Sequence, residues 1–128
     1  GINVRELLID TSSLIDFFQG RADKKTVELM STSELAISSI TFGELYKFTL
    51  KTGKTPLWPT YKQRLSNYKI IDVTKEISEK AAGISHMFGL SLIDSTIYAT
   101  AAENGLGLLT SDSDFKGLKN VIIVEKLH

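Results

Sequence analysis

The sequence predicts an α/β domain built on a mainly parallel sheet, and three observations support this fold class. Five short runs rich in β-forming residues alternate with segments whose apolar residues recur at helical spacing. The chain has 128 residues, a length typical of one domain, so we expect residues 1–128 to form a single unit. Hydrophobic residues make up 42% of the chain and charged residues 23%, which is enough apolar material for one core.

The five runs define the expected strands. The first, Glu6–Ile9, is apolar apart from Glu6, and this pattern is typical of a central strand that is covered on both faces. The later strands are expected over residues 36–38, 69–73, 106–110 and 121–124.

Helices are expected over residues 14–18, 24–30, 41–50, 56–67, 74–88 and 91–103. Thr74 is a good N-cap for the fifth of these helices. The third begins with Thr41-Phe-Gly-Glu44 and the sixth with Ser91-Leu-Ile-Asp94, and both sequences have the pattern of a capping box.

The composition excludes several kinds of chemistry. The chain has no cysteine and two histidines, so disulfides, thiol catalysis, iron–sulfur clusters and Cys/His zinc sites are ruled out. Fifteen basic and fifteen acidic residues give a net charge of zero, which argues against binding of nucleic acid by bulk charge alone. Catalysis therefore has to depend on oxygen ligands.

The expected location is the cytoplasm, without a membrane partner. No apolar stretch reaches the roughly 18 residues that a membrane helix needs. The N-terminal residues lack the charged region, apolar core and cleavage site of a secretory signal.

The middle of the chain is basic and aromatic. No acidic residue occurs from Leu45 to Ile71, and this segregation predicts a local basic face on a neutral protein. The cations proposed to bind substrate are Lys47, Lys51, Lys54, Lys62 and Arg64. We interpret the interleaved aromatic residues mainly as core, with Trp58 as the best candidate for an exposed ring.

Acidic residues follow two of the predicted strands. Asp10 comes directly after the first strand, and Asp112 and Asp114 follow the fourth. Ligands of open parallel sheets bind beyond the carboxyl ends of the strands, so these acids converge if the two strands are neighbours. Glu44 and Asp94, in the first turns of their predicted helices, could join them. Such a cluster of hard oxygen ligands suits Mg²⁺ or Mn²⁺.

Each of these acids also has an ordinary structural interpretation. Glu44 and Asp94 can complete capping boxes, Asp10 can be a solvated turn residue, and Asp112 and Asp114 can form an Asx turn. We favour a site because all five occur together and in contexts that bring them to one edge of the sheet.

Four segments of this chain resemble the PIN domain, and in particular the small VapC-type toxins of prokaryotic toxin–antitoxin pairs. In order along the chain, they are Leu-Leu-Ile-Asp10-Thr-Ser-Ser, Ile-Thr-Phe-Gly-Glu44-Leu, Leu-Ile-Asp94-Ser-Thr-Ile-Tyr-Ala-Thr-Ala and Leu-Leu-Thr-Ser-Asp112-Ser-Asp114-Phe. The last is the most specific, and the resemblance covers nearly the whole chain.

The resemblance implies a three-layer α/β/α fold with a five-stranded parallel sheet of order 3-2-1-4-5. It also implies a catalytic set of Asp10, Glu44, Asp94 and Asp112 that binds one or two Mg²⁺ or Mn²⁺ ions through Asp10, Asp94 and Asp112. Asp114, at a position that varies more in the family, is a further metal ligand. Thr110 and Ser12 match supporting positions beside the acids.

The implied activity is hydrolysis of RNA by a metal-dependent endoribonuclease. The resemblance further implies a homodimer and an antitoxin protein that blocks the acidic crevice, with the region around Trp58 contributing to both interfaces. Two alternatives stay open: a PIN-fold module that binds RNA or protein without cleavage, and a stand-alone PIN nuclease of RNA processing. A haloacid-type phosphatase is disfavoured because Asp10-Thr-Ser12 offers only one carboxylate.

Overall fold

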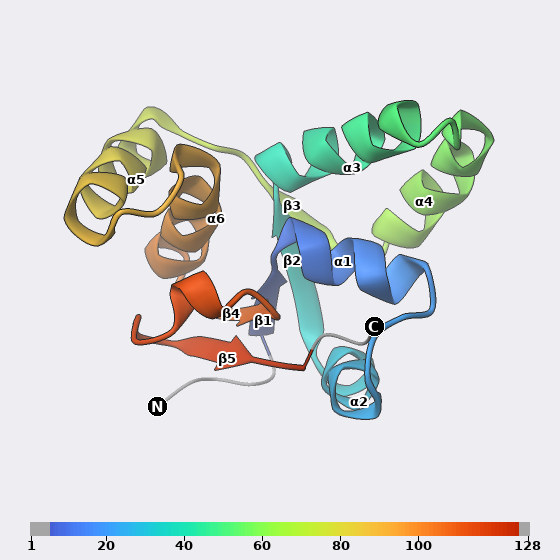
Figure 1. Ribbon diagram of the computed structural model, residues 1–128, viewed down its shortest axis with the longest axis horizontal. Coiled ribbons are helices and arrows are strands. Elements are labelled where there is room, and N and C mark those ends of the chain that lie inside the picture. The colour runs from blue at the N-terminus through green and yellow to red at the C-terminus, as the bar shows by residue number, and fades with distance from the viewer. Residues whose placement is uncertain (1–5, 126–128) are drawn as a thin grey trace.

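The computed structural model describes residues 6–125, and its centre is a five-stranded parallel sheet of order β3-β2-β1-β4-β5 (Figure 1). This confirms the predicted strand order. The strands are β1 (Glu6–Ile9), β2 (Glu34–Ser38), β3 (Lys69–Ile71), β4 (Gly107–Thr110) and β5 (Val121–Ile123).

Helices cover both faces of the sheet, so the predicted three-layer α/β/α architecture is also confirmed (Figure 1). One side carries α5 (Lys75–Phe88) and α6 (Leu92–Glu103), which pack together as a hairpin. The other carries α1 (Thr11–Phe18), α2 (Lys24–Thr32), α3 (Ser39–Lys51) and α4 (Trp58–Leu65). Two short 3₁₀ helices, η1 (Thr55–Leu57) and η2 (Ser113–Phe115), complete the described elements.

The alternation of side chains along β1 divides the core into two halves. Leu7 and Ile9 pack with residues of the α1–α4 side, such as Leu45. Leu8 points the other way and packs with Ile97 of α6. All of these side chains are fully buried or nearly so, and β1 is therefore covered on both faces, as its apolar sequence predicts.

The register of the two central strands sets the position of the acidic residues. Ile9 of β1 pairs with Leu109 of β4, so Asp10, which follows β1, lies beside Thr110, the last residue of β4. The backbone N–H of Asp10 donates to the carbonyl of Leu109 at 3.1 Å. The chain turns into α1 immediately after β1, and Asp10 is the N-cap of that helix.

Three helix predictions need correction. The helix predicted over 14–18 starts three residues earlier, at Thr11, because Asp10 is its N-cap. The predicted helix over 56–67 is divided into η1 and α4, because Pro59 has no N–H to continue an α-helical ladder and instead occupies the first turn of α4. The helix predicted to start at Thr41 starts at Ser39, with Ser38 as its N-cap. Nowhere in residues 6–125 is there a helix whose length and hydropathy would allow it to cross a bilayer.

Candidate active site

Five carboxylates extend from the carboxyl edge of the sheet or from the elements that begin there. Asp10 caps α1 and Asp112 caps η2, which contains Asp114. Asp94 lies in the first turn of α6, and Glu44 lies in the second turn of α3. The acids that the sequence suggested thus come from four separate segments and meet beside β1 and β4.

Asp10 is the most deeply buried of the five carboxylates, with 4% of its surface exposed. Its Oδ1 accepts a hydrogen bond from the backbone N–H of Ser13 at 3.0 Å, and its Oδ2 accepts one from the Thr110 hydroxyl at 2.5 Å. Burial raises the pKa of Asp10 above its ordinary value, the bonds from Thr110 and Ser13 oppose this shift, and the charge of Asp112 adds to it. The carboxylate is therefore held rigidly in a place that favours a nearby cation.

Thr110 connects two of the acids. Besides donating to Asp10, its fully buried hydroxyl oxygen accepts a hydrogen bond from the backbone N–H of Asp112 at 2.9 Å. Ser12 is exposed, and its hydroxyl lies 3.5 Å from Asp10 Oδ2. Of the two supporting residues that the resemblance implies, Thr110 thus makes the closer contact with the acids.

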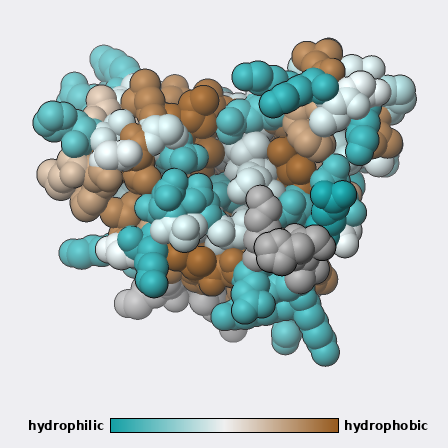
Figure 2. Space-filling view, viewed as in Figure 1, coloured by the Kyte–Doolittle hydropathy of each residue, from teal (hydrophilic) through white to brown (hydrophobic). Residues whose placement is uncertain are grey.

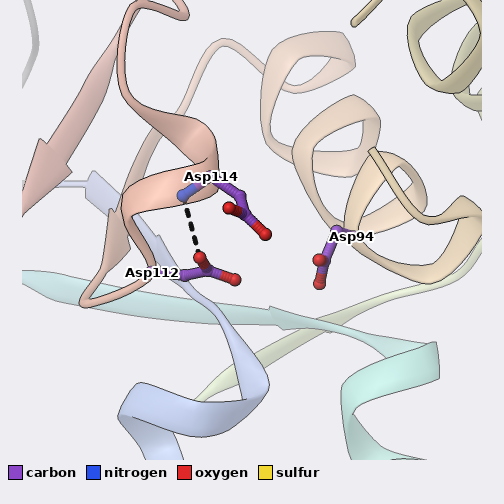
Figure 3. A group of neighbouring side chains, drawn as sticks. All are labelled: Asp94, Asp112 and Asp114. Atoms are coloured by element: carbon purple, nitrogen blue, oxygen red, sulfur yellow. Dashed lines mark hydrogen bonds between the residues drawn. The ribbon is translucent and has the colours of Figure 1, made fainter. Parts of the chain in front are cut away.

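Asp94, Asp112 and Asp114 point toward one another across the space between η2 and α6 (Figure 3). One carboxylate oxygen from each lies within 4.8 Å of the other two. The backbone N–H of Asp114 donates to Asp112 Oδ1 at 2.8 Å, so the Asx turn that was the alternative to a site forms here together with the cluster. The second oxygen of Asp112 accepts no bond that competes with a ligand in the described structure.

The electrostatics of Asp94 show that the cluster extends beyond these three acids. Burial raises the pKa of Asp94, and the charges of Asp112, Asp10 and Glu44 raise it further, against a hydrogen bond with Ser91. Ser91 caps α6 by accepting from the Asp94 N–H at 3.1 Å. Asp94 therefore completes the helix cap and faces the other acids at the same time.

Glu44 does not act as a capping residue, and the capping box predicted from Thr41 is wrong. Since the helix begins two residues earlier, Thr41 lies inside it, fully buried. The Thr11 hydroxyl lies 3.0 Å from that of Thr41 and 2.6 Å from Glu44 Oε1. A chain of two hydroxyls thus holds Glu44 toward the start of α1.

Two residues with clear roles in building the site were not singled out from the sequence. Thr11 orients Glu44, and the Ser13 hydroxyl accepts a hydrogen bond from the backbone N–H of Ser111 at 3.0 Å. This second bond fastens the segment after β4 to the first turn of α1. In the sequence, the run of three hydroxyl residues directly after Asp10 is the one feature that indicates these roles.

The proposed substrate-binding cations lie on α3, on α4 and, for Lys54, directly before η1, away from the acidic cluster. Lys47, Lys51, Lys54 and Lys62 are exposed. Arg64 is half-buried and contacts Phe18 of α1. Trp58, the best candidate for an exposed ring, is half-buried, and its ring contacts Phe42 and Tyr46, with centroids 5.2 and 4.9 Å away.

The donor set of the cluster fits a hard divalent cation. All donors are carboxylate oxygens, without histidine or cysteine, as Mg²⁺ and Mn²⁺ prefer. Oxygens around octahedral Mg²⁺ are about 3.0 Å apart when adjacent and about 4.2 Å apart when opposite. The oxygens of Asp94, Asp112 and Asp114 lie within 4.8 Å of one another, so these side chains would move closer together to hold one ion. Burial first, and then the charges of Asp112, Asp10 and Glu44, raise the pKa of Asp94, and both effects would be relieved by a bound cation.

Comparisons with known proteins agree with this picture. A family model described as the PIN domain matches residues 7–121. A chain from a toxin–antitoxin complex of Klebsiella pneumoniae is 30% identical, with a TM-score of 0.81 over 93% of this chain and 98% of that one. A search of curated proteins finds no match.

Two more distant solved structures share the fold. VapBC2 from Rickettsia felis, bound to a DNA fragment from their promoter, gives a TM-score of 0.76 at 21% identity over 94% of this chain and 98% of that one. Mycobacterium tuberculosis VapC20, a sarcin–ricin loop cleaving toxin, gives a TM-score of 0.71 at 17% identity over 95% of this chain and 99% of that one.

Proposed function

The chain belongs to the PIN domain family, and from this we propose that it is a divalent-metal-dependent endoribonuclease and the toxin of a toxin–antitoxin pair. The observation that carries the proposal is the convergence of five carboxylates at the carboxyl edge of the sheet, three of them with oxygens within 4.8 Å of one another. A module that only binds RNA would have no need of this electrostatically costly cluster.

In this proposal Asp94, Asp112 and Asp114 would hold Mg²⁺ or Mn²⁺, with Asp10 as a further ligand, and one or two ions would bind. A bound cation supplies positive charge that stabilises the transition state on the scissile phosphate and makes the attacking water more acidic. Thr110 and the Ser13 N–H keep Asp10 oriented. Glu44, directed by Thr11, accepts the proton of the water or adds a ligand.

The choice of RNA as substrate and of an antitoxin as partner is supported by the similar proteins. The Klebsiella pneumoniae chain comes from a toxin–antitoxin complex, and VapC20 is a sarcin–ricin loop cleaving toxin. We extend both properties to this chain, which we place in the cytoplasm.

Exposed apolar side chains give such a protein surfaces for its partners, an antitoxin and a second copy in a homodimer. Met87 and Leu92 are 74% and 58% exposed at the tip of the α5–α6 hairpin, and Leu50 is 53% exposed on α3. Figure 2 shows apolar surface over this hairpin and over the corner where α3 meets α4. These patches lie on either side of the acidic site, where a bound partner could cover it.

The test is a cleavage assay on structured and single-stranded RNA with Mg²⁺, Mn²⁺ or EDTA. We expect metal-dependent cleavage that falls by at least about 100-fold in the Asp10→Asn/Asp112→Asn variant, because both proposed ligands are lost. Asp72→Asn is the matched control, since it removes an exposed carboxylate that also follows a strand but lies outside the cluster.

Cleavage that persists in the double variant would show that the activity comes from elsewhere. If no RNA is cut, a Mn²⁺ titration decides between the alternatives. If the original chain binds no more Mn²⁺ than the double variant, the carboxylate site is not a metal site. The non-catalytic binding module is then the better interpretation.

A further inference from the structure

A cavity of about 410 Å³ lies between the end of α1, η1 and α4, away from the acidic cluster. Three cations, Arg21, Lys54 and Arg64, line it, and its lining contains no acidic residue. Phe18 and Tyr61 contribute aromatic walls. We call this space the α1–α4 cavity. Its volume is in the range of sites that hold small ligands.

Two of the cations, Arg21 and Lys54, occupy the same position relative to the helix that precedes them. Arg21 follows Gly20 at the end of α1, and Lys54 follows Gly53 at the end of α3. Both glycines have positive φ, 72° and 68°. The N–H of each basic residue donates to the carbonyl five residues earlier at 2.7 Å, which is the closing bond of a Schellman motif.

Arg64 is oriented by contacts with α1. Its Nη1 donates to the carbonyl of Phe18 at 3.2 Å, and its guanidinium carbon lies 4.0 Å from the centroid of the Phe18 ring. A guanidinium has five N–H donors in a planar fork, so four remain for a ligand. The stacked ring holds the fork in place and reduces the entropy that binding would cost.

The cavity keeps a positive charge. Within residues 6–125 Lys80 and Glu103 form an ion pair, whereas no carboxylate pairs with Arg21, Lys54 or Arg64. The C-termini of α1 and α3 each contribute roughly half a negative charge, which lowers the cost of gathering three cations there. The three cations carry three positive charges, and the two helix C-termini together contribute about one negative charge. The cavity therefore stays positive and attracts an anion.

We propose that the α1–α4 cavity binds a phosphate of the RNA strand at a distance from the bond that is cut. That the anion is RNA rests on the proposed function. The planar fork of Arg64 matches phosphate oxygens, and α1 leads directly from the cavity to Asp10. Eight helical residues separate the two places by about 12 Å, so one strand lying along α1 can reach both.

RNA fits this position better than an acidic protein segment does. The helix that ends at the cationic cavity begins at the acidic site, where an RNA phosphate is the expected reactant. A second phosphate of the same strand at the cavity would fix the register of the strand relative to the carboxylates.

The test measures binding of a fluorescein-labelled single-stranded RNA by fluorescence anisotropy, in the Asp10→Asn/Asp112→Asn background so that the RNA stays intact. Adding Arg21→Gln/Lys54→Gln should weaken binding about tenfold and lower the salt slope by roughly 1, because a phosphate contact is lost. The matched control is Lys24→Gln/Lys75→Gln, which removes two exposed lysines on α2 and α5 and should change affinity less than about twofold.

The proposal would be overturned if the cavity variant and the control variant lost equal affinity for RNA, or if the cavity variant lost none. A cavity variant that keeps its affinity for RNA but loses affinity for polyglutamate would also overturn it, because the cavity would then serve an acidic protein segment. Cleavage is not measured, so a failure of the nuclease assay does not affect this result.

Discussion

At the scale of single residues, Asp10 shows how the site combines order with electrostatic cost. Two hydrogen bonds, from the Ser13 N–H and the Thr110 hydroxyl, stabilise its ionised form. Burial outweighs them, and the pKa is raised. This carboxylate is firmly held and yet disfavoured as an anion, and no cationic side chain of residues 6–125 offsets its charge, so a bound metal ion would stabilise it.

Because ionised Asp10 and Asp94 are disfavoured in the folded protein, stability should depend on pH when metal is removed. The folded pKa values of Asp10 and Asp94 are raised above 3.8, so folding favours their protonated forms. Their contribution to stability is fully present below about pH 3.8 and is lost as pH rises through the raised values. With EDTA present, the free energy of unfolding should therefore increase as pH falls from 7 toward 4.

Urea denaturation at a series of pH values measures this dependence. Asp23, whose pKa is lowered by its hydrogen bonds with Thr26, acts in the opposite direction only below about pH 4. An Asp10→Asn/Asp94→Asn variant should show a flatter profile between pH 7 and 4. An equally steep profile in this variant would assign the effect to other groups.

At the scale of elements, the sequence was informative where a local pattern decides the structure. The first strand matches its prediction, Glu6–Ile9, because a central strand needs continuous apolar character. The start of α3 was misplaced because Ser38, Ser39 and Thr41 are all acceptable caps. Only the end of β2, set by pairing of Ser38 with Ile71, selects among them.

The same distinction applies to the site. The acids could be named because each follows a strand or starts a helix, and because their motifs resemble one family. The resemblance also implied Thr110, but Thr11 and Ser13 could not be predicted, since Thr11 contacts a residue 33 positions away and Ser13 one 98 positions away. Such contacts depend on how α1, α3 and β4 pack, which local sequence does not specify.

Thr11 provides a test of how two elements cooperate. Thr11→Val keeps the shape of the side chain but removes the hydrogen bond that joins α1 to Glu44 on α3. We expect RNA cleavage to fall about tenfold through kcat, as for other groups that orient a catalytic residue. The thermal midpoint should change little.

Thr11→Ser is the control, because it restores the hydroxyl and should restore most of the activity. If Val and Ser at this position reduce cleavage equally, packing rather than the hydrogen bond is responsible.

At the scale of the whole molecule, the acidic cluster joins parts of the chain that are far apart in sequence. Asp10 comes from the first strand–helix junction and Asp112 from the segment after β4, with Asp94 on the opposite helical layer. Repulsion among these groups works against the packed arrangement of all three. A ligand that binds them together therefore stabilises the fold and not only the local loop.

Divalent metal should accordingly raise the unfolding temperature of the full chain. At a Mn²⁺ concentration 100 times its Kd, binding to the folded state alone contributes about 2.7 kcal/mol, which corresponds to roughly 10 °C for a domain of this size. Differential scanning calorimetry with Mn²⁺ and then with EDTA measures this shift. Asp94→Asn/Asp112→Asn should abolish it and Asp72→Asn should retain it. In EDTA the double variant should also melt at a higher temperature than the original chain, because it lacks the repulsion that the metal would neutralise. A lower thermal midpoint would show that the acids do not oppose folding.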